Sequence, residues 1–141
     1  MTRIVEKMKK IPGLTHIRGC SEKQIVEAQK VLDIIFPDEY IEYVKTFGCI
    51  DFDATEWTGL NIEGRLNTVV ATNKEKQFNK DFPKGFFVLE NLEIDGKIVI
   101  VNQEGNVYLL QFGQIILLCN SMSDYLDLCT KKTPSLFPPS H

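Results

Sequence analysis

The chain has 141 residues, 43% of them hydrophobic and 25% charged, with a net charge of −3. These values are average for a soluble globular protein, and they exclude a disordered chain, a disulfide-rich scaffold and a multidomain machine. The longest apolar run, residues 115–119, is far shorter than the roughly 20 residues that a membrane-spanning helix needs. We therefore predict one domain over residues 1–141 with no membrane partner.

The N-terminal segment mixes charged and apolar side chains, since Arg3 and Lys7 lie among Ile4, Val5 and Met8. A secretory signal needs an uninterrupted apolar stretch, so we predict a cytoplasmic protein. The cysteines form no Cys-x-x-Cys pair and have no histidine at ligand spacing. We interpret them as small buried side chains and predict neither a metal nor a cofactor. These cysteines are Cys20, Cys49, Cys119 and Cys129.

The negative charge is concentrated in one segment. Residues 33–63 hold eight acids and one base, a net charge of −7, whereas the remainder of the chain is net positive. Such a segment repels the phosphates of nucleic acid and attracts basic proteins. We predict a basic protein partner and no nucleic acid. A solvated acidic surface without a partner is the alternative interpretation.

Two helices are predicted in the first third of the chain. Ser21 begins a capping-box pattern, and apolar residues at helical spacing follow over about residues 22–33 and on to Ile35. Pro37 and the two acids after it predict the first turn of a second helix, because proline needs no amide partner there and acids favour the positive helix end. Gly48 follows the last apolar position and is predicted to end that helix.

The pattern then changes to the period of two that is typical of a half-buried strand. Ile50, Phe52 and Ala54 are predicted to face inward. Three acidic residues lie on or beside the exposed face of this strand: Asp51, Asp53 and Glu56.

The remaining sequence predicts an antiparallel meander between two helices. The first of these helices covers about residues 68–76, after a cap at Asn67 or the next residue. Four short β-rich runs separated by turn residues then follow, at 86–90, 97–102, 107–112 and 115–119. A final helix begins at Ser121 or Ser123, and residues 130–141 are predicted to be irregular. Strands in a block with helices before and after them predict the α+β fold class.

The sequence contains no specific catalytic motif. A Gly-x-Ser-x-Gly elbow is absent, and Gly59 and Gly64 are not followed by the lysine that a phosphate-binding loop requires. Asp51 and Asp53 could share a metal ion or divide acid and base roles, but two acids at this spacing are ordinarily solvated. We predict that the chain is not an enzyme.

The only tryptophan lies in the segment Trp57-Thr58-Gly59-Leu60, close to the acids. Trp57 is either a binding hot spot beside these acids or a core residue. We predict that the segment lies at a strand end or turn beside the second helix, with Leu60 buried. Gly59 is predicted to allow a close backbone approach or a positive φ.

Several motifs occur together in a characteristic order. They are Ile25, Ala28 and Leu32; Phe36-Pro37, Tyr40, Val44 and Phe47-Gly48; Trp57-Thr58-Gly59-Leu60; Val69-Val70 and Thr72; Phe87-Val88; Asp95-Gly96; Gly105 and Val107-Tyr108; and Ser123 with Tyr125-Leu126. This order resembles the SUKH superfamily, which includes fungal regulators of cell-wall glucan synthesis and bacterial immunity proteins of polymorphic toxin systems. The resemblance covers about residues 21–129.

The resemblance implies an α+β fold with helices packed around a curved antiparallel sheet. It further implies a non-enzymatic binding protein, namely an immunity protein that neutralises a cognate toxin such as a basic nuclease inside the producing bacterium. A regulatory scaffold or interaction module without a toxin partner stays as the alternative. The predicted partner-binding residues are Asp51, Asp53, Glu56, Trp57 and Glu63.

Overall fold

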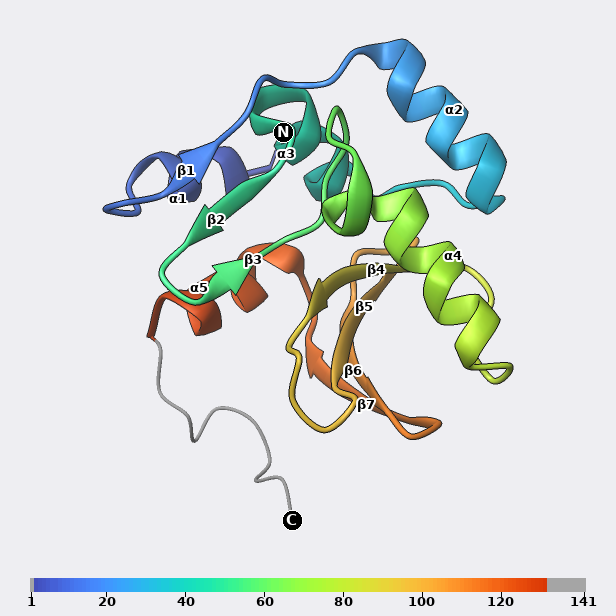
Figure 1. Ribbon diagram of the computed structural model, residues 1–141. Coiled ribbons are helices and arrows are strands. Elements are labelled where there is room, and N and C mark those ends of the chain that lie inside the picture. Colours follow the sequence, from blue (N-terminus) through green and yellow to red (C-terminus); the bar gives the residue numbers. More distant parts are fainter. Residues whose placement is uncertain (1, 132–141) are drawn as a thin grey trace.

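The computed structural model describes residues 2–131. Within these residues the chain forms five α-helices, one short 3-10 helix and two antiparallel sheets (Figure 1). The helices are α1 (Ile4–Lys9), α2 (Glu22–Leu32), α3 (Asp38–Phe47), η1 (Gly64–Leu66), α4 (Thr68–Phe78) and α5 (Met122–Lys131). The predicted α+β class is confirmed.

The larger sheet is the predicted meander. Its strands are β4 (Phe86–Asn91), β5 (Ile98–Asn102), β6 (Val107–Gln111) and β7 (Gln114–Cys119), and each pairs antiparallel with the next. The pairing register shifts between Val88 and Glu90 and again between Val107 and Tyr108. Such bulges bend strands, and Figure 1 shows the sheet to be strongly curved.

The smaller sheet has the order β1 (Thr15–His16), β2 (Ile50–Phe52), β3 (Thr55–Glu56). Neither β1 nor α1 was predicted from the sequence. The two buried side chains of α1, Ile4 and Met8, are spaced as one helical face, but six residues give little periodicity to detect.

The helix boundaries follow the local chemistry that the sequence indicates. Ser21 and Gln24 form the reciprocal capping box, with the Gln24 amide donating to the Ser21 hydroxyl at 3.2 Å. Pro37 lies one position earlier than predicted, as the N-cap of α3. Gly48 ends α3 with a φ of 70°, and the Asn67 side chain caps α4.

Two inward-facing positions were predicted wrongly. Asp33 adopts a left-handed conformation with φ 54°, which ends α2 and turns Ile34 into the core. Ile35 is consequently 68% exposed, although the helical stripe placed it inside. Ala54 is exposed because the strand ends at Phe52 and turns back.

The C-terminal prediction is tested over two residues. Thr130 and Lys131 belong to α5, so they are not irregular. The remaining residues of the predicted tail, 132–141, lie outside the described residues.

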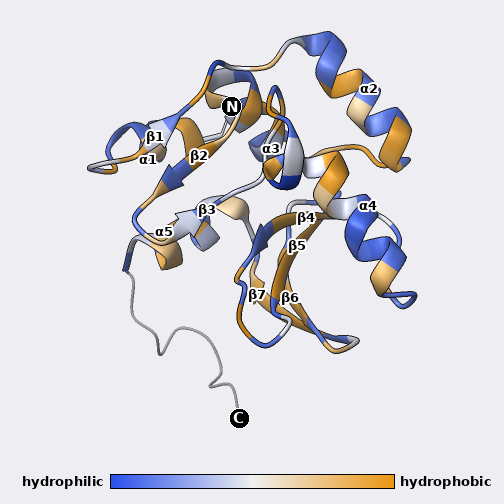
Figure 2. Cartoon of the chain, in the orientation of Figure 1, coloured by the Kyte–Doolittle hydropathy of each residue, from blue (hydrophilic) through white to orange (hydrophobic). Residues whose placement is uncertain are grey.

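The core consists of two clusters on opposite faces of the large sheet. The larger cluster includes Phe87, Val99 and Val101 from the sheet and buried side chains of all helices except α4 and η1. The smaller cluster occupies the face near α4 and consists of Val88, Ile98, Ile100 and Leu110. Figure 2 shows the resulting contrast between the hydrophobic strands of the large sheet and the more polar β2 and β3.

The segment after β3 joins the two sheets. The Thr58 amide donates to the Leu89 carbonyl at 2.7 Å, and the Leu60 amide donates to the Gly48 carbonyl at 2.9 Å. A Cβ atom on Gly59 would lie only 1.8 Å from the Gly48 oxygen, so glycine is required here by close backbone approach. Leu60 is buried. The prediction for this segment is confirmed.

Candidate functional site

The candidate site is built on the hairpin formed by β2 and β3. Asp51 pairs directly with Glu56, and Phe52 pairs with Thr55, so residues 53 and 54 form a two-residue turn. The turn begins with Asp53 at φ 51°, a conformation that aspartate tolerates better than most residues. Directly opposed residues point to the same face, which brings Asp51 and Glu56 together.

Each of these two acids has a polar partner in another element. The Thr15 hydroxyl of β1 donates to the Asp51 carboxylate. The Arg65 guanidinium donates to both oxygens of Glu56, at 3.1 and 3.2 Å. This bidentate pair raises the pKa of Arg65 and connects η1 to the hairpin. The pairing of Glu56 with Arg65 relieves the repulsion between the two opposed carboxylates.

Asp53 extends the hairpin toward a groove between α1 and α5. This groove has a volume of about 520 Å³, and Asp53 and Phe52 form part of its wall. Lys7 and Lys10 from the α1 region also line it, and Lys7 is paired with Asp127 at 2.8 Å. Asp53 is therefore close to positive as well as negative side chains.

Glu63 lies outside the hairpin. It is exposed and forms the N-cap position of η1, two residues before Arg65. The structure thus brings Asp51, Asp53 and Glu56 together on one hairpin and places Glu63 on the following loop.

Trp57 is not part of this surface, and its predicted role as an exposed contact is wrong. Its side chain is 0% exposed. The ring packs edge-on against Tyr43, with centroids 5.6 Å apart, and stacks on Tyr125 at 6.0 Å. Glu56 of β3 is half-buried and points outward, so the next residue, Trp57, turns inward by strand alternation and belongs to the core.

Other acids of the segment 33–63 have structural partners. Glu39 of α3 accepts hydrogen bonds from the Met122 and Ser123 amides, at 2.8 and 3.1 Å, and so caps α5. Burial raises the pKa of Glu39, and these two amides oppose the rise. Glu42 accepts a hydrogen bond from the Thr2 amide at 2.8 Å. No sequence pattern indicates these contacts, because the partners lie up to 84 residues apart.

A buried carboxyl group was also missed. Glu90 of β4 is 4% exposed and accepts a hydrogen bond from the Tyr125 hydroxyl at 2.6 Å. Burial raises the pKa of Glu90 to about 7, although the bonds from Tyr125 and from the Glu56 backbone lower it. Because this carboxyl group is enclosed, its protonation is coupled to the stability of the fold.

Three of the four cysteines are small core residues, and Cys119 is half-buried. All four cysteines are free, and three of them are buried. Burial raises the pKa of Cys20 and Cys49 to about 11 and that of Cys129 to about 12, which keeps these thiols protonated. Within residues 2–131 no three His, Cys, Asp or Glu side chains are grouped closely enough to bind a metal ion.

Comparison with known families agrees with this fold. The model of the SMI1-KNR4 cell-wall family, SUKH_5, matches residues 1–130. The chain belongs to the SUKH superfamily. The match covers α1 and β1 as well as the region that carries the sequence resemblance. SUKH proteins of the SMI1-KNR4 type are not a known enzyme family. No curated protein matches this SUKH chain. None of its described helices is long and apolar enough to cross a membrane.

Proposed function

We propose that this SUKH protein is a non-enzymatic immunity protein, which binds a cognate basic toxin in the cytoplasm and blocks its active surface. Family membership supports a binding role. The observation that carries the proposal is the acidic hairpin, where Asp51, Asp53 and Glu56 share one exposed element. A nuclease is one suitable toxin, since its phosphate-binding surface is complementary to a carboxylate ridge.

The charges of the hairpin region differ in how strongly they can act on a partner. Arg65 neutralises Glu56. Asp51 and Glu63 are exposed and have no cation within 4 Å among residues 2–131. Exposed charges mainly increase the association rate and contribute little to the lifetime of a complex. A long-lived complex therefore also needs an apolar contact close to the hairpin.

The groove next to Asp53 supplies that contact in the proposed complex. Phe52 and Leu126 are among the residues that line it, but both are buried and offer little surface to a partner. Ile11, which is half-buried, and Pro12, which is exposed, provide its accessible apolar surface. In the proposed complex an apolar side chain of the toxin enters this groove, while basic side chains of the toxin contact the hairpin. This apolar side chain, and not Trp57, is the proposed anchor.

The test first asks whether a toxin domain is encoded directly upstream of this gene. Where one is encoded there, that domain is the probe, hereafter the candidate toxin. We expect coexpression of the wild-type chain to restore growth in cells that produce this domain, and the two proteins to form a stable complex. A triple variant, Asp51→Asn, Asp53→Asn and Glu63→Gln, should protect less. A control with the same net charge is the triple variant Glu27→Gln, Asp81→Asn and Glu104→Gln, whose positions are exposed on other elements.

Failure of the wild-type chain both to protect and to bind the candidate toxin contradicts the proposal. The same result, or a gene with no toxin gene beside it, supports the alternative of a regulatory scaffold. Equal loss in the two triple variants would attribute protection to net charge and not to the hairpin.

A further inference from the structure

The outer edge of the large sheet is an exposed apolar strand. β7 ends the order β4-β5-β6-β7, and none of the described strands pairs with its outer side. Its middle residues are apolar and exposed: Ile115 at 43%, Ile116 at 45% and Leu117 at 51%. An apolar edge strand with open hydrogen-bonding groups is a template for another strand.

The opposite edge of the same sheet is covered by the chain itself. Thr58 donates from its amide to the Leu89 carbonyl, and its hydroxyl donates to the Val88 carbonyl at 2.8 Å. The Val88 amide donates to the Thr72 hydroxyl at 2.9 Å. Among residues 2–131 no segment bonds to the outer side of β7 in this way, and β7 lacks the charged residues and prolines that usually protect an edge. No charged residue occurs anywhere from Gln111 to Ser123.

We infer that β7 pairs antiparallel with β7 of a second copy of this chain, forming a two-fold symmetric dimer with a continuous eight-stranded sheet. The local geometry fixes the register. Gln111 and Gln114 flank the two-residue turn of the β6–β7 hairpin, so they form a hydrogen-bonded pair. Pairs alternate, and the free backbone groups of β7 therefore belong to Ile115 and Leu117.

With a two-fold axis at Ile116, each of these free backbone groups finds one hydrogen-bond partner in the other copy. Ile115 of each copy then opposes Leu117 of the other, and both have free amide and carbonyl groups to exchange. The side chains match as well. Ile115 and Leu117 share the sheet face of Tyr108 and Leu110, whereas Ile116 lies on the opposite face and meets its own copy on the axis. Every one of these contacts is apolar against apolar, with no like charges opposed.

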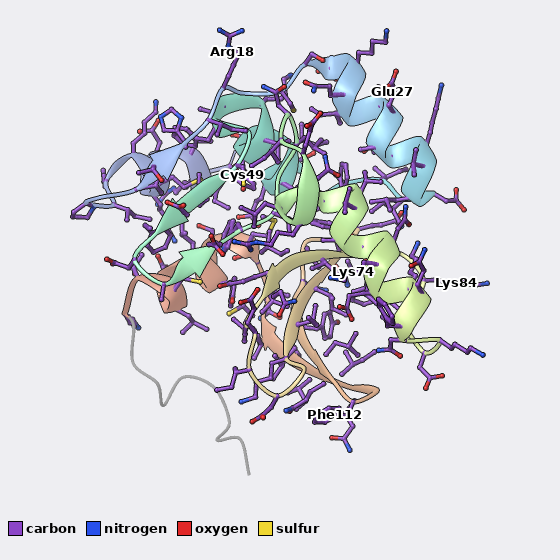
Figure 3. All side chains as sticks on the ribbon, in the orientation of Figure 1. Arg18, Glu27, Cys49, Lys74, Lys84 and Phe112 are labelled. Atoms are coloured by element: carbon purple, nitrogen blue, oxygen red, sulfur yellow. The ribbon has the colours of Figure 1, made fainter. Side chains whose placement is uncertain are left out.

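The same register also brings the tip of the β6–β7 hairpin beside the second copy. Phe112, labelled at this tip in Figure 3, is 80% exposed, and its ring lies beside Gly96 of the β4–β5 turn. In the dimer it lies level with Asn120 of the other copy. A basic partner would bind to acidic side chains, and β7 has none. The uncharged strand therefore favours a second copy of this chain as its partner.

The interface is small. Six strand residues span roughly 20 Å, and we expect burial on the order of 500 Å² per copy, below the ~800 Å² of a standard interface. The dimer should therefore dissociate on dilution, with a dissociation constant in the micromolar range. The dimer interface lies on a different sheet from the acidic hairpin. If the chain proves to be monomeric, the proposal of toxin binding is therefore unaffected.

The first test is sedimentation of the purified full chain from about 1 to 500 μM, a range that brackets a micromolar constant. We expect wild type to shift from monomer to dimer, and Ile116→Lys to stay monomeric. The matched control is Ile35→Lys, at a 68% exposed position after α2, and it should behave as wild type. A monomeric wild type throughout, or a dimeric Ile116→Lys, overturns the inference.

The second test avoids a lysine at position 116, which could disturb the fold of the monomer. In a Cys119→Ser background, Ile116→Cys should form an intermolecular disulfide under mild oxidation, because residues paired on the axis have Cα atoms about 4.5 Å apart. Ile35→Cys in the same background should not. Equal cross-linking of both variants, or none at position 116, contradicts the proposed register.

Discussion

Two hairpins of this protein have similar backbones and opposite surfaces. Both β2–β3 and β6–β7 turn through two residues, and the first turn residue has a positive φ in each, 51° at Asp53 and 50° at Phe112. The first hairpin exposes acids, whereas the second exposes an apolar strand. The backbone of a hairpin therefore does not determine how its surface behaves.

The difference separates two kinds of recognition. Carboxylates on β2–β3 act over about a Debye length, roughly 8 Å at physiological salt, and can guide a basic partner before contact. The apolar strand β7 acts only on contact, through backbone hydrogen bonds and burial. One surface suits the proposed toxin, and the other suits the proposed second copy.

The largest effect is expected where the two sheets are joined. Gly59→Ala places a Cβ 1.8 Å from the Gly48 carbonyl oxygen, so the backbone must move. We expect a loss of about 3 kcal/mol or more in the free energy of unfolding, measured by urea titration with Trp57 fluorescence. The control is Gly64→Ala, which has open space but a φ of 84° and should lose about 1 kcal/mol. A smaller loss at Gly59 than at Gly64 contradicts this account of the junction.

The buried acid should behave differently from the acids of the hairpin. Burial raises the pKa of Glu90 from 4.5 to about 7, so the native protein binds this proton more tightly than the unfolded chain does. Stability should therefore fall as the pH rises from about 4.5 to 7, by about 3 kcal/mol. Glu39 contributes in the same direction, because its pKa is also raised.

Glu90→Gln should remove most of this pH dependence and stabilise the protein at neutral pH, since the amide oxygen can still accept from Tyr125. Thermal unfolding at several pH values measures the effect. Glu27→Gln, at an exposed position on α2, is the control and should leave the profile as in wild type. If the stability of Glu90→Gln falls with pH as steeply as that of wild type, Glu90 is not the main source of the pH dependence.

A smaller effect is expected from the cation that neutralises the hairpin. The Arg65–Glu56 pair is largely exposed, so Arg65→Met should change stability by no more than about 0.5 kcal/mol. It should nevertheless speed association with the candidate toxin at low salt, because Glu56 becomes an unpaired acid. The control is Lys45→Met, which removes the same charge from the exposed pair that Lys45 of α3 forms with Glu22 of α2. Equal acceleration by both variants would indicate a net-charge effect.

Much of the fold was predictable because it depends on local chemistry. The capping box at Ser21, the left-handed Gly48 and the turn residues between the strands of the meander act within a few residues of themselves. The curvature of the sheet was predicted only from the resemblance to SUKH proteins. Ile35 shows the limit, since one left-handed residue, Asp33, interrupts a helical stripe without changing the apolar pattern.

The candidate site was predictable only in part. Alternation placed Asp51 on an exposed face, but it could not show that Arg65 reaches back to Glu56 or that Glu39 caps a helix 83 residues later. Trp57 could not be assigned, because a large aromatic residue suits a core and an interface equally well. The edge position of β7 was likewise invisible, since neighbours in a sheet are set by tertiary structure.

The most direct test of the central claim is the association rate with the candidate toxin, measured by stopped flow at low and high salt. The triple variant Asp51→Asn, Asp53→Asn and Glu63→Gln should associate about tenfold more slowly than wild type at low salt, with a flatter salt dependence. The triple control Glu27→Gln, Asp81→Asn and Glu104→Gln, with equal net charge, should stay close to wild type. Thermal melts must show all three proteins folded. An unchanged low-salt rate for the hairpin variant would show that these acids form only a solvated face and that the partner binds elsewhere.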